Sequence, residues 1–146
     1  MATSASLFKK ILIPVDNSKV AINAARKAMQ IVVNISQAQL ILLHIVDIRA
    51  IETMARYGQE SKEALLVKTE ESGWNLLYGL EEEAVSQAVR VALVLESGEP
   101  HRLILDSADK YQVDLIVLGK HRKTGARKDV IVPAIIENAE CPVLLV

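Results

Sequence analysis

Short apolar runs alternate with longer amphipathic segments along this chain. The apolar runs lie at residues 11–15, 40–46, 89–95, 114–119 and 142–146. Between them, apolar residues recur at spacings of three and four, which is typical of helices that bury one face. This alternation predicts β-α-β units, and right-handed crossovers then favour an open five-stranded parallel sheet of the doubly wound α/β type.

The predicted helices have identifiable starts. Asp16, Asn17 and Ser18 follow the first strand, and each side-chain oxygen can accept a backbone N–H that a helix start leaves unpaired. Pro100 suits the first turn of the helix after the third strand, because its missing N–H is not needed there. A short helix is expected over residues 131–138.

The segment between residues 51 and 88 is open to two interpretations. Apolar residues keep helical spacing from Leu66 to Ala84, which predicts a helix. Gly73 argues against one unbroken helix, since glycine costs about 1 kcal/mol relative to alanine inside a helix. The residues before Gly73 are therefore also compatible with a mobile loop, and whether residues 50–62 close over a cleft is left open.

Composition supports the α/β assignment. Hydrophobic residues make up 51% of the chain, yet it holds only one Phe, one Trp and three Tyr, so Val, Ile, Leu and Ala must build the core. The central strands of a parallel sheet, which helices cover on both faces, have this makeup. The length of 146 residues, without an internal repeat or a linker, predicts a single domain over residues 1–146.

Charge and targeting signals narrow the expected partners. A formal net charge of −1 argues against a general attraction to nucleic acid or to acidic membranes. The N-terminus lacks the pattern of a signal peptide, and no apolar run approaches the roughly 18 residues of a membrane helix. Cys141 is the only cysteine, so no disulfide can form within the chain. We expect a cytoplasmic protein with no nucleic-acid and no membrane partner.

The carboxyl ends of the predicted strands are where a ligand site is expected. Ligands of open parallel sheets bind outside these ends, where the strand order reverses. Here the ends are Val15–Asp16, Ile45–Val46 and Leu118–Gly119. No Ser-His-Asp order, paired carboxylates in a plausible cleft or Cys/His metal cluster accompanies them. The sequence therefore favours a binding protein, with neither catalytic residues nor a metal site.

Several segments resemble one family along nearly the whole chain. K-K-I-L-I-P-V-D-N-S is similar to the opening strand and acidic turn of universal stress proteins, and L-I-L-L-H-I-V-D to their second strand. S-G-E-P is similar to the turn before their third helix, D-L-I-V-L-G to their fourth strand and C-P-V-L-L-V to their last. The resemblance implies a Rossmann-like sheet of order 3-2-1-4-5, a homodimer and a stress-response or regulatory role, with ATP bound by some members only.

The resemblance also implies where a nucleotide would lie. Carried over by position, Pro14, Val15, Asp16 and Ile45 would hold the adenine and the ribose. The phosphates would lie on a loop of pattern G-x-x-G-x9-G-S/T that begins at Gly119. Glycines in such a loop let backbone N–H groups approach the phosphates, and the closing Ser or Thr stands at a helix N-terminus that favours anions.

The phosphate loop departs from this pattern. Arg122 stands at the second glycine position, Asp129 at the last glycine position and Val130 at the Ser/Thr position. Asp129 can cap the following helix with its own carboxylate and repel a phosphate there. A run of cations in the same loop could attract phosphate and oppose the repulsion by Asp129. These cations are Lys120, Arg122, Lys123, Arg127 and Lys128. A solvated basic loop is the favoured interpretation of that run.

Other notable residues have structural explanations beside any functional one. Asp16 can serve the start of the first helix instead of a ribose. His44 lies in the middle of a strand and is best explained as a buried histidine with a satisfied hydrogen bond. The last strand is apolar and lies at a sheet edge in the implied order, so the expected homodimer surface consists of Val143, Leu144, Leu145 and Val146.

Two functional hypotheses follow. The favoured one is a non-catalytic, dimeric regulatory domain of the stress response, with a degenerate nucleotide site, weak or no ATP binding and an unknown protein partner. It requires no cofactor, although ATP or AMP can bind. The alternative is an ATP or AMP sensor with slow ATPase activity, in which the basic loop supplies the phosphate contacts. A nucleic-acid role for the loop is disfavoured, because no aromatic platform accompanies it.

Overall fold

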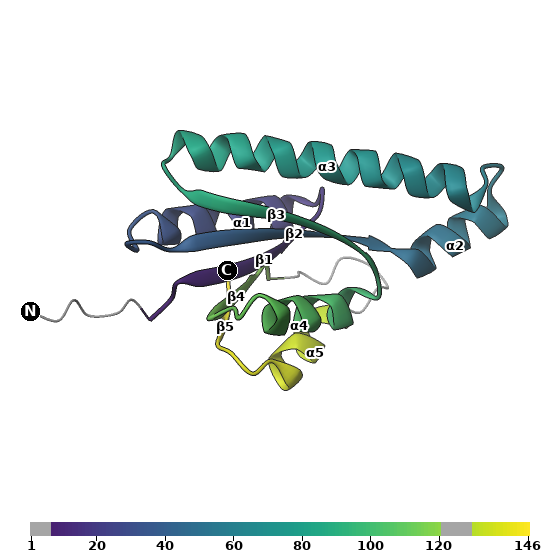
Figure 1. The fold of residues 1–146 in the computed structure, drawn as a ribbon. Coiled ribbons are helices and arrows are strands. Elements are labelled where there is room, and N and C mark those ends of the chain that lie inside the picture. The colour runs from purple at the N-terminus through teal and green to yellow at the C-terminus, as the bar shows by residue number, and fades with distance from the viewer. Residues whose placement is uncertain (1–6, 121–129) are drawn as a thin grey trace, which may run out of the picture.

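The computed structural model describes residues 7–120 and 130–146. The strands within these ranges are β1 (Lys10–Val15), β2 (Gln39–Asp47), β3 (Arg90–Gly98), β4 (Leu115–Leu118) and β5 (Val143–Leu145). The helices are α1 (Lys19–Val32), α2 (Ile48–Tyr57), α3 (Lys62–Ser86), α4 (Pro100–Lys110) and α5 (Ile131–Asn138). The strands form one parallel sheet of order β3-β2-β1-β4-β5 (Figure 1), which confirms the predicted fold class and strand order.

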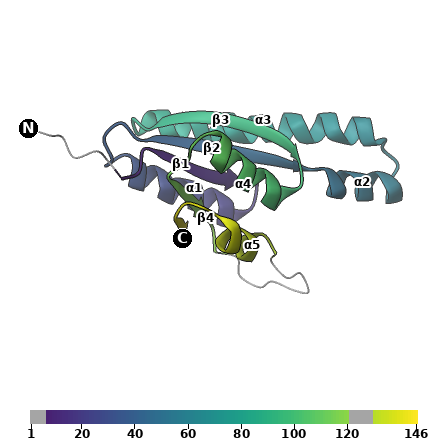
Figure 2. The ribbon, with the colours of Figure 1, turned by 60° about the horizontal axis from the view of Figure 1, so that its bottom comes forward.

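The sheet is a central layer with helices on both faces. Helices α1 and α3 cover one face, and α4 and α5 cover the other (Figure 1, Figure 2). In β1, Ile11 and Ile13 pack toward α1 and α3, whereas Leu12 packs toward α4 and α5. Successive side chains of a strand point to opposite faces, so a strand covered on both sides must be apolar at nearly every position.

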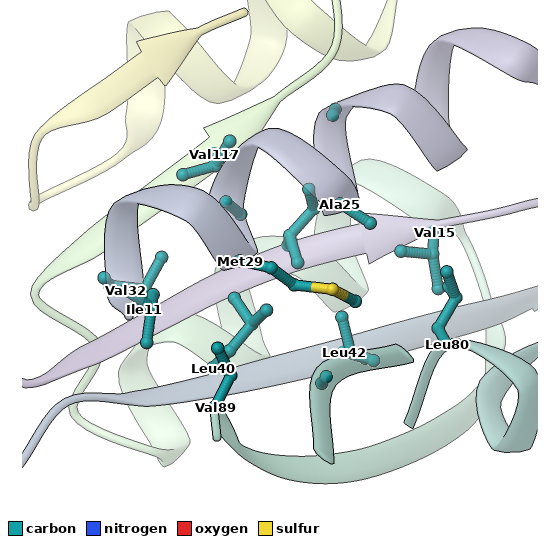
Figure 3. Packing of buried hydrophobic residues seen from close by; sticks show 14 of the residues in the cluster. Ile11, Val15, Ala25, Met29, Val32, Leu40, Leu42, Leu80, Val89 and Val117 are labelled. Atoms are coloured by element: carbon teal, nitrogen blue, oxygen red, sulfur yellow. The ribbon is translucent and has the colours of Figure 1, made fainter. Parts of the chain in front are cut away.

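Met29 of α1 lies in the middle of the core between the sheet and the helices α1 and α3 (Figure 3). Its side chain is fully buried beside Leu40 and Leu42 of β2. Ala25 and Ala28 lie on the same buried face of α1, where their small side chains let the helix approach the sheet. Burying a methionine side chain stabilises the fold by about 1.5–3 kcal/mol, so this face of α1 anchors the helix.

Helix α1 begins where the sequence predicts, and Ser18 and Asp16 have different roles at its start. Ser18 is the N-cap residue, and its Oγ accepts the Ala21 N–H at 3.1 Å. Asp16 does not cap the helix itself; its Oδ1 accepts the Ser18 N–H at 2.7 Å and so holds the capping residue in place. This turn fixes the chain direction at the carboxyl end of β1.

Helix α3 is unbroken over 25 residues, which confirms the helical interpretation of this segment, and Gly73 does not interrupt it. The alternative of a loop before Gly73 is wrong, because α2 and the first turns of α3 occupy most of that stretch. A Cβ atom on Gly73 would lie 2.4 Å from Cδ2 of His44 and 2.9 Å from Cδ1 of Leu95. Glycine is therefore present because α3 crosses the sheet closely at this point, and the packing outweighs its low helix propensity.

Helix α2 and the start of α3 form a helical pair beyond the carboxyl end of the sheet (Figure 1). A small core of Val46, Ile51 and Leu65 joins this pair to the end of β2. Asp47 caps α2, since its Oδ1 accepts the N–H groups of Arg49 and Ala50 at 3.1 and 3.3 Å. Among residues 7–120 and 130–146, no helix combines the length and apolar character that a membrane crossing requires.

The close crossing of α3 and β2 makes Gly73 sensitive to substitution. Gly73→Ala should lower the free energy of unfolding by about 1–3 kcal/mol, because the methyl group overlaps a histidine ring that cannot turn away. The ring is held by a 2.8 Å hydrogen bond between its Nδ1 and the Val15 carbonyl. Urea denaturation followed by circular dichroism measures the change.

Gly79→Ala is the matched control in the same helix. No atom outside the helix backbone lies within 4 Å of a Cβ at this exposed position. The substitution should raise the free energy of unfolding by about 0.5–1 kcal/mol through helix propensity alone. The same chemical change is thus expected to have opposite signs at the two positions, and a stabilised Gly73→Ala protein would refute the packing explanation.

Candidate functional site

The hydrogen-bond ladder between β1 and β4 stops early. The two strands pair only at Ile11–Leu12, opposite Leu115–Ile116, whereas β1 pairs with β2 along its whole length. The Lys10 carbonyl accepts the Asp114 N–H at 2.8 Å and so points toward β4. Backbone groups two residues apart in a strand point the same way, so those of Pro14 also face β4. Proline has no N–H to donate, and the two strands separate at their carboxyl ends.

A cavity of about 250 Å³ opens where β1 and β4 separate. It lies at the carboxyl ends of β1, β2 and β4, where the strand order reverses and where doubly wound sheets bind ligands. Its polar side chains are Asp16, Ser18 and Asp47. Its apolar walls come from the sheet, α4 and α5: Leu43, Ile45, Leu118, Ile104, Ile131 and Val132.

Most of the described residues that the sequence marks as candidates meet at this cavity. Pro14, Val15, Asp16, Ile45 and Gly119 all line it. Lys120 is exposed directly after Gly119 and does not line it. Val130 is also exposed, at the N-cap position of α5, and lines no part of it. The candidates Arg122 and Asp129 lie outside the described residues, as does most of the basic run from Lys120 to Lys128.

Several cavity residues were not among the candidates. Asp47 ends β2, and a carboxylate at the end of a central strand is a signal in the sequence that could have found it. Ile104 of α4 and Val132 of α5 look like ordinary core residues in the sequence, and only the tertiary structure brings them to the cavity. Residues 50–62 form most of α2 and the turn into α3, and none of them lines the cavity.

The two carboxylates at the cavity also serve the backbone around it. Asp16 binds the Ser18 N–H through Oδ1, and Asp47 binds the first N–H groups of α2 through Oδ1. Within the described residues, both use this one oxygen in these bonds, and Oδ2 of each is available as an acceptor. The arrangement places two hydrogen-bond acceptors at the rim of an apolar space.

His44 lies behind the cavity and does not enter it. Its ring is buried, and its Nδ1 lies 2.8 Å from the Val15 carbonyl. Because a carbonyl only accepts, Nδ1 carries the proton in this bond. The side chain faces α3, on the opposite side of the sheet from Leu43 and Ile45. His44 therefore ties β1 to β2, which confirms its structural interpretation.

Gly119 has a packing role that does not involve a ligand. A Cβ atom at this position would lie 2.5 Å from Cγ1 and 3.0 Å from the carbonyl oxygen of Val20. The end of β4 thus passes directly against the first turn of α1, where a larger residue would clash with backbone as well as side chain. This contact is by itself a sufficient reason for glycine at the start of the loop.

A second hollow of about 450 Å³ lies at the other end of the sheet, between α4 and α5. Its polar lining is mainly acidic, with Asp106, Asp109, Asp114 and Glu140, and includes no Lys or Arg. Burial, and then the carboxylate of Asp114, raise the pKa of the Cys141 thiol there, so it stays protonated at neutral pH and is a poor nucleophile. No group of three or more metal-ligating side chains could hold an ion in the described part of the chain.

Comparison by sequence identifies relatives along the whole described chain. A profile of the universal stress protein family matches residues 7–146. Universal stress protein MJ0531 of Methanocaldococcus jannaschii is 31% identical over 144 residues, which cover 97% of this chain and 83% of that protein.

Comparison of structures gives the same grouping. A solved structure of MJ0577, a universal stress protein of the same archaeon, superposes with a TM-score of 0.82 at 27% identity and covers 97% of this chain and 96% of its own. An Arabidopsis thaliana family protein solved with AMP bound gives a TM-score of 0.67 at 19% identity, with 94% and 90% covered. At that identity the second match supports the fold alone.

The contact of Gly119 with α1 predicts a loss of stability that needs no nucleotide. Gly119→Ala should lower the free energy of unfolding by about 1–3 kcal/mol in nucleotide-free protein, because its methyl group overlaps Val20. Adding Val20→Ala should recover only part of this loss, since the clash with the Val20 carbonyl remains. Chemical denaturation checks both variants; unaltered stability of Gly119→Ala would show that packing does not require glycine here.

Proposed function

This chain belongs to the universal stress protein family, and on that premise we propose that it is a non-catalytic regulatory protein of the stress response whose cavity binds the nucleoside part of an adenine nucleotide. The phosphates add little to the affinity, so ATP is held weakly. The cavity at the switch point of the sheet, apolar inside and acidic at its rim, is the observation that carries this proposal.

The apolar walls suit a flat heteroaromatic base. Ile45 and Leu118 from the sheet, and Ile104 from α4, face the same space. Its volume of about 250 Å³ is just below the roughly 300–1,000 Å³ of typical small-molecule pockets. A compact base fits such a space, which Val15 and Gly119 also line.

The two rim carboxylates suit ribose hydroxyls. A carboxylate accepts hydrogen bonds and a sugar hydroxyl can donate them. Asp16 and Asp47 follow β1 and β2, which are neighbours in the sheet, so their free oxygens stand on the same side of the cavity. The same charges disfavour a phosphate at this rim, which supports a ligand whose bound part is the nucleoside.

The start of α5 contributes little to phosphate binding. Val130 stands at the N-cap with 66% of its surface exposed, and it has no hydroxyl to offer. Pro133, in the first turn of α5, lacks the N–H that a helix start would present to an anion. In the sequence, Arg122 and Asp129 replace two glycines of the family loop. Family membership leads us to take adenine nucleotides as the ligand class, and the Arabidopsis structure of the same fold was solved with AMP bound.

A titration series separates base binding from phosphate binding. Isothermal titration calorimetry with adenosine, AMP and ATP at moderate salt should give dissociation constants within about tenfold of one another, a spread of about 1.4 kcal/mol. ATP should bind more weakly than about 10 μM. Ile45→Phe should abolish binding of all three ligands, because the larger ring fills the cavity.

Val94→Phe is the control for that substitution. Val94 is half-buried in β3, on the same face of the sheet as Ile45, and lies outside the cavity. Its enlargement should leave the three dissociation constants unchanged. Micromolar or tighter ATP binding beside much weaker adenosine binding would overturn the proposal that the phosphates contribute little.

The same series tests the alternative, an ATP or AMP sensor with slow ATPase activity. The observation in its favour is that Gly119 lines the cavity and Lys120 follows it, so the basic run begins at the rim. In a sensor of this kind, reversing the charge of Arg122 and Lys123 would abolish ATP binding and spare adenosine. In the favoured proposal the reversal changes neither affinity by more than about threefold.

We further propose that the protein acts in the cytoplasm as a homodimer that pairs through β5. β5 is an edge strand, hydrogen-bonded to β4 on one side. Leu144 pairs with Val117 and lies on the face of the sheet that carries α1 and α3, yet it remains 37% exposed. An apolar edge invites pairing, and a two-fold related copy is the simplest partner.

A charged residue at this edge should separate the copies that pair through β5. Leu144→Asp places like charges near the two-fold axis and should weaken dimerisation at least tenfold, or about 1.4 kcal/mol, by sedimentation velocity. Truncation of residues 143–146 is a poorer test, because the Val146 N–H donates to the Leu118 carbonyl and its carbonyl accepts the Lys120 N–H. An assembly state and a dissociation constant that are both unchanged by Leu144→Asp would contradict pairing through β5.

A further inference from the structure

β3 forms the other edge of the sheet, far from β5 (Figure 1). All nine of its residues pair with β2, and no strand of the described ranges pairs with its outer side. From Val91 to Leu95 every residue is apolar and half-exposed. The strand holds neither the lysines nor the prolines that commonly protect a sheet edge.

We propose that this edge is a self-association surface, at which β3 pairs antiparallel with β3 of a second copy about a two-fold axis through Leu93. Arg90 and Glu96 are the only charged residues of the strand, and they stand three residues before and three after Leu93. In this register Arg90 of each copy lies opposite Glu96 of the other. The charges of the edge are thus self-complementary, which selects a second copy of the chain as the occupant.

The register also satisfies the geometry of an antiparallel ladder. In this register odd-numbered residues lie opposite odd-numbered residues, and even-numbered opposite even-numbered. Backbone groups of alternate residues point the same way, so the outward-directed N–H and C=O groups of one copy meet those of the other. Arg90 and Glu96 lie on the face that carries Ala92 and Val94, which pack toward α4. Opposed side chains share a face, so the two ion pairs form there beside apolar pairs.

The outer flank of α3 extends the same surface. At 100° per residue, Trp74, Tyr78 and Val85 lie within about 40° of one another around the helix, whereas Glu83 lies about 180° from Trp74. Glu83 is ion-paired with Arg26 of α1 at 2.8 Å, so the Trp74 flank faces away from α1 and overhangs β3.

This flank presents exposed apolar and aromatic side chains. Trp74 and Tyr78 stack with ring centroids 5.7 Å apart, and Tyr78 is 53% exposed. Val85 is exposed too and shares a hollow with Arg90 and Val91 of β3. A two-fold axis perpendicular to the sheet keeps both α3 helices on one face, so their flanks meet and bury these side chains, although Glu71 and Glu81 interrupt the apolar stripe.

The β3 surface is separate from the β5 edge and from the nucleotide cavity. Because β3 and β5 lie at opposite edges of the sheet, homodimers formed through β5 can join further through β3, and the chain then assembles beyond a dimer. The Leu144→Asp background therefore isolates the β3 contact, and nucleotide is not needed for it.

Charge exchange across the axis tests the proposal. In Leu144→Asp protein, sedimentation equilibrium should detect a dimer that Arg90→Glu or Glu96→Arg each weakens by at least about tenfold, since two ion pairs become two like-charge pairs. The double variant Arg90→Glu/Glu96→Arg should restore the dissociation constant to within about threefold. Arg102→Glu, an exposed arginine on α4, is the matched control and should change nothing. A monomeric Leu144→Asp protein, or a double variant that is not restored, would overturn the proposal.

Cysteine cross-linking tests the register without the Leu144→Asp substitution. In a Cys141→Ser background, Leu93→Cys should form a disulfide-linked dimer on mild oxidation, because Leu93 faces its own copy across the axis. Val91→Cys in the same background faces Leu95 and should cross-link poorly. Equal cross-linking of the two variants, or none for Leu93→Cys, would contradict the proposed axis.

Discussion

The missing N–H of Pro14 is the constraint on which the candidate site depends. Because this residue faces β4 and cannot donate to it, the ladder ends at Leu12 and the carboxyl ends of the two strands separate. On the other side of β1, the bond from His44 to the Val15 carbonyl holds β1 to β2, so the opening is confined to the β4 side. The cavity is therefore a consequence of strand geometry, and its existence does not depend on the composition of the loop that follows Gly119.

The sequence predicted the elements well wherever a repeating pattern decided them. Strand order, helix placement and the span of α5 follow from alternation of apolar runs with helical spacing, together with the family resemblance. Gly73 misled the prediction because helix propensity is local, whereas the reason for the glycine is the ring of His44 on another element. Asp16 and Gly119 were found as cavity residues because they follow strand ends, a position that topology marks, whereas Pro14, inside β1, was found only through the family resemblance. The cavity residues that come from α4 and α5 could not be predicted in this way, because in the sequence they look like ordinary core residues of a helix.

The proposed ligand site and the proposed self-association surfaces lie apart in the structure. The cavity lies at the carboxyl ends of the central strands, and the two unpaired edges lie at the sides of the sheet. The cavity is closely packed against the rest of the core, because Gly119 lines it and also brings the end of β4 against α1. A regulatory protein with this arrangement can hold a small ligand and pair with another copy at once, since neither surface covers the other.

The most direct test of the account is a titration of ¹⁵N-labelled protein with adenosine, followed by amide chemical shifts. The account predicts that the perturbed amides cluster at Val15, Ile45 and Gly119, around the opening that Pro14 creates. Perturbations centred on the acidic hollow near Cys141, or no perturbation at saturating adenosine, would contradict it.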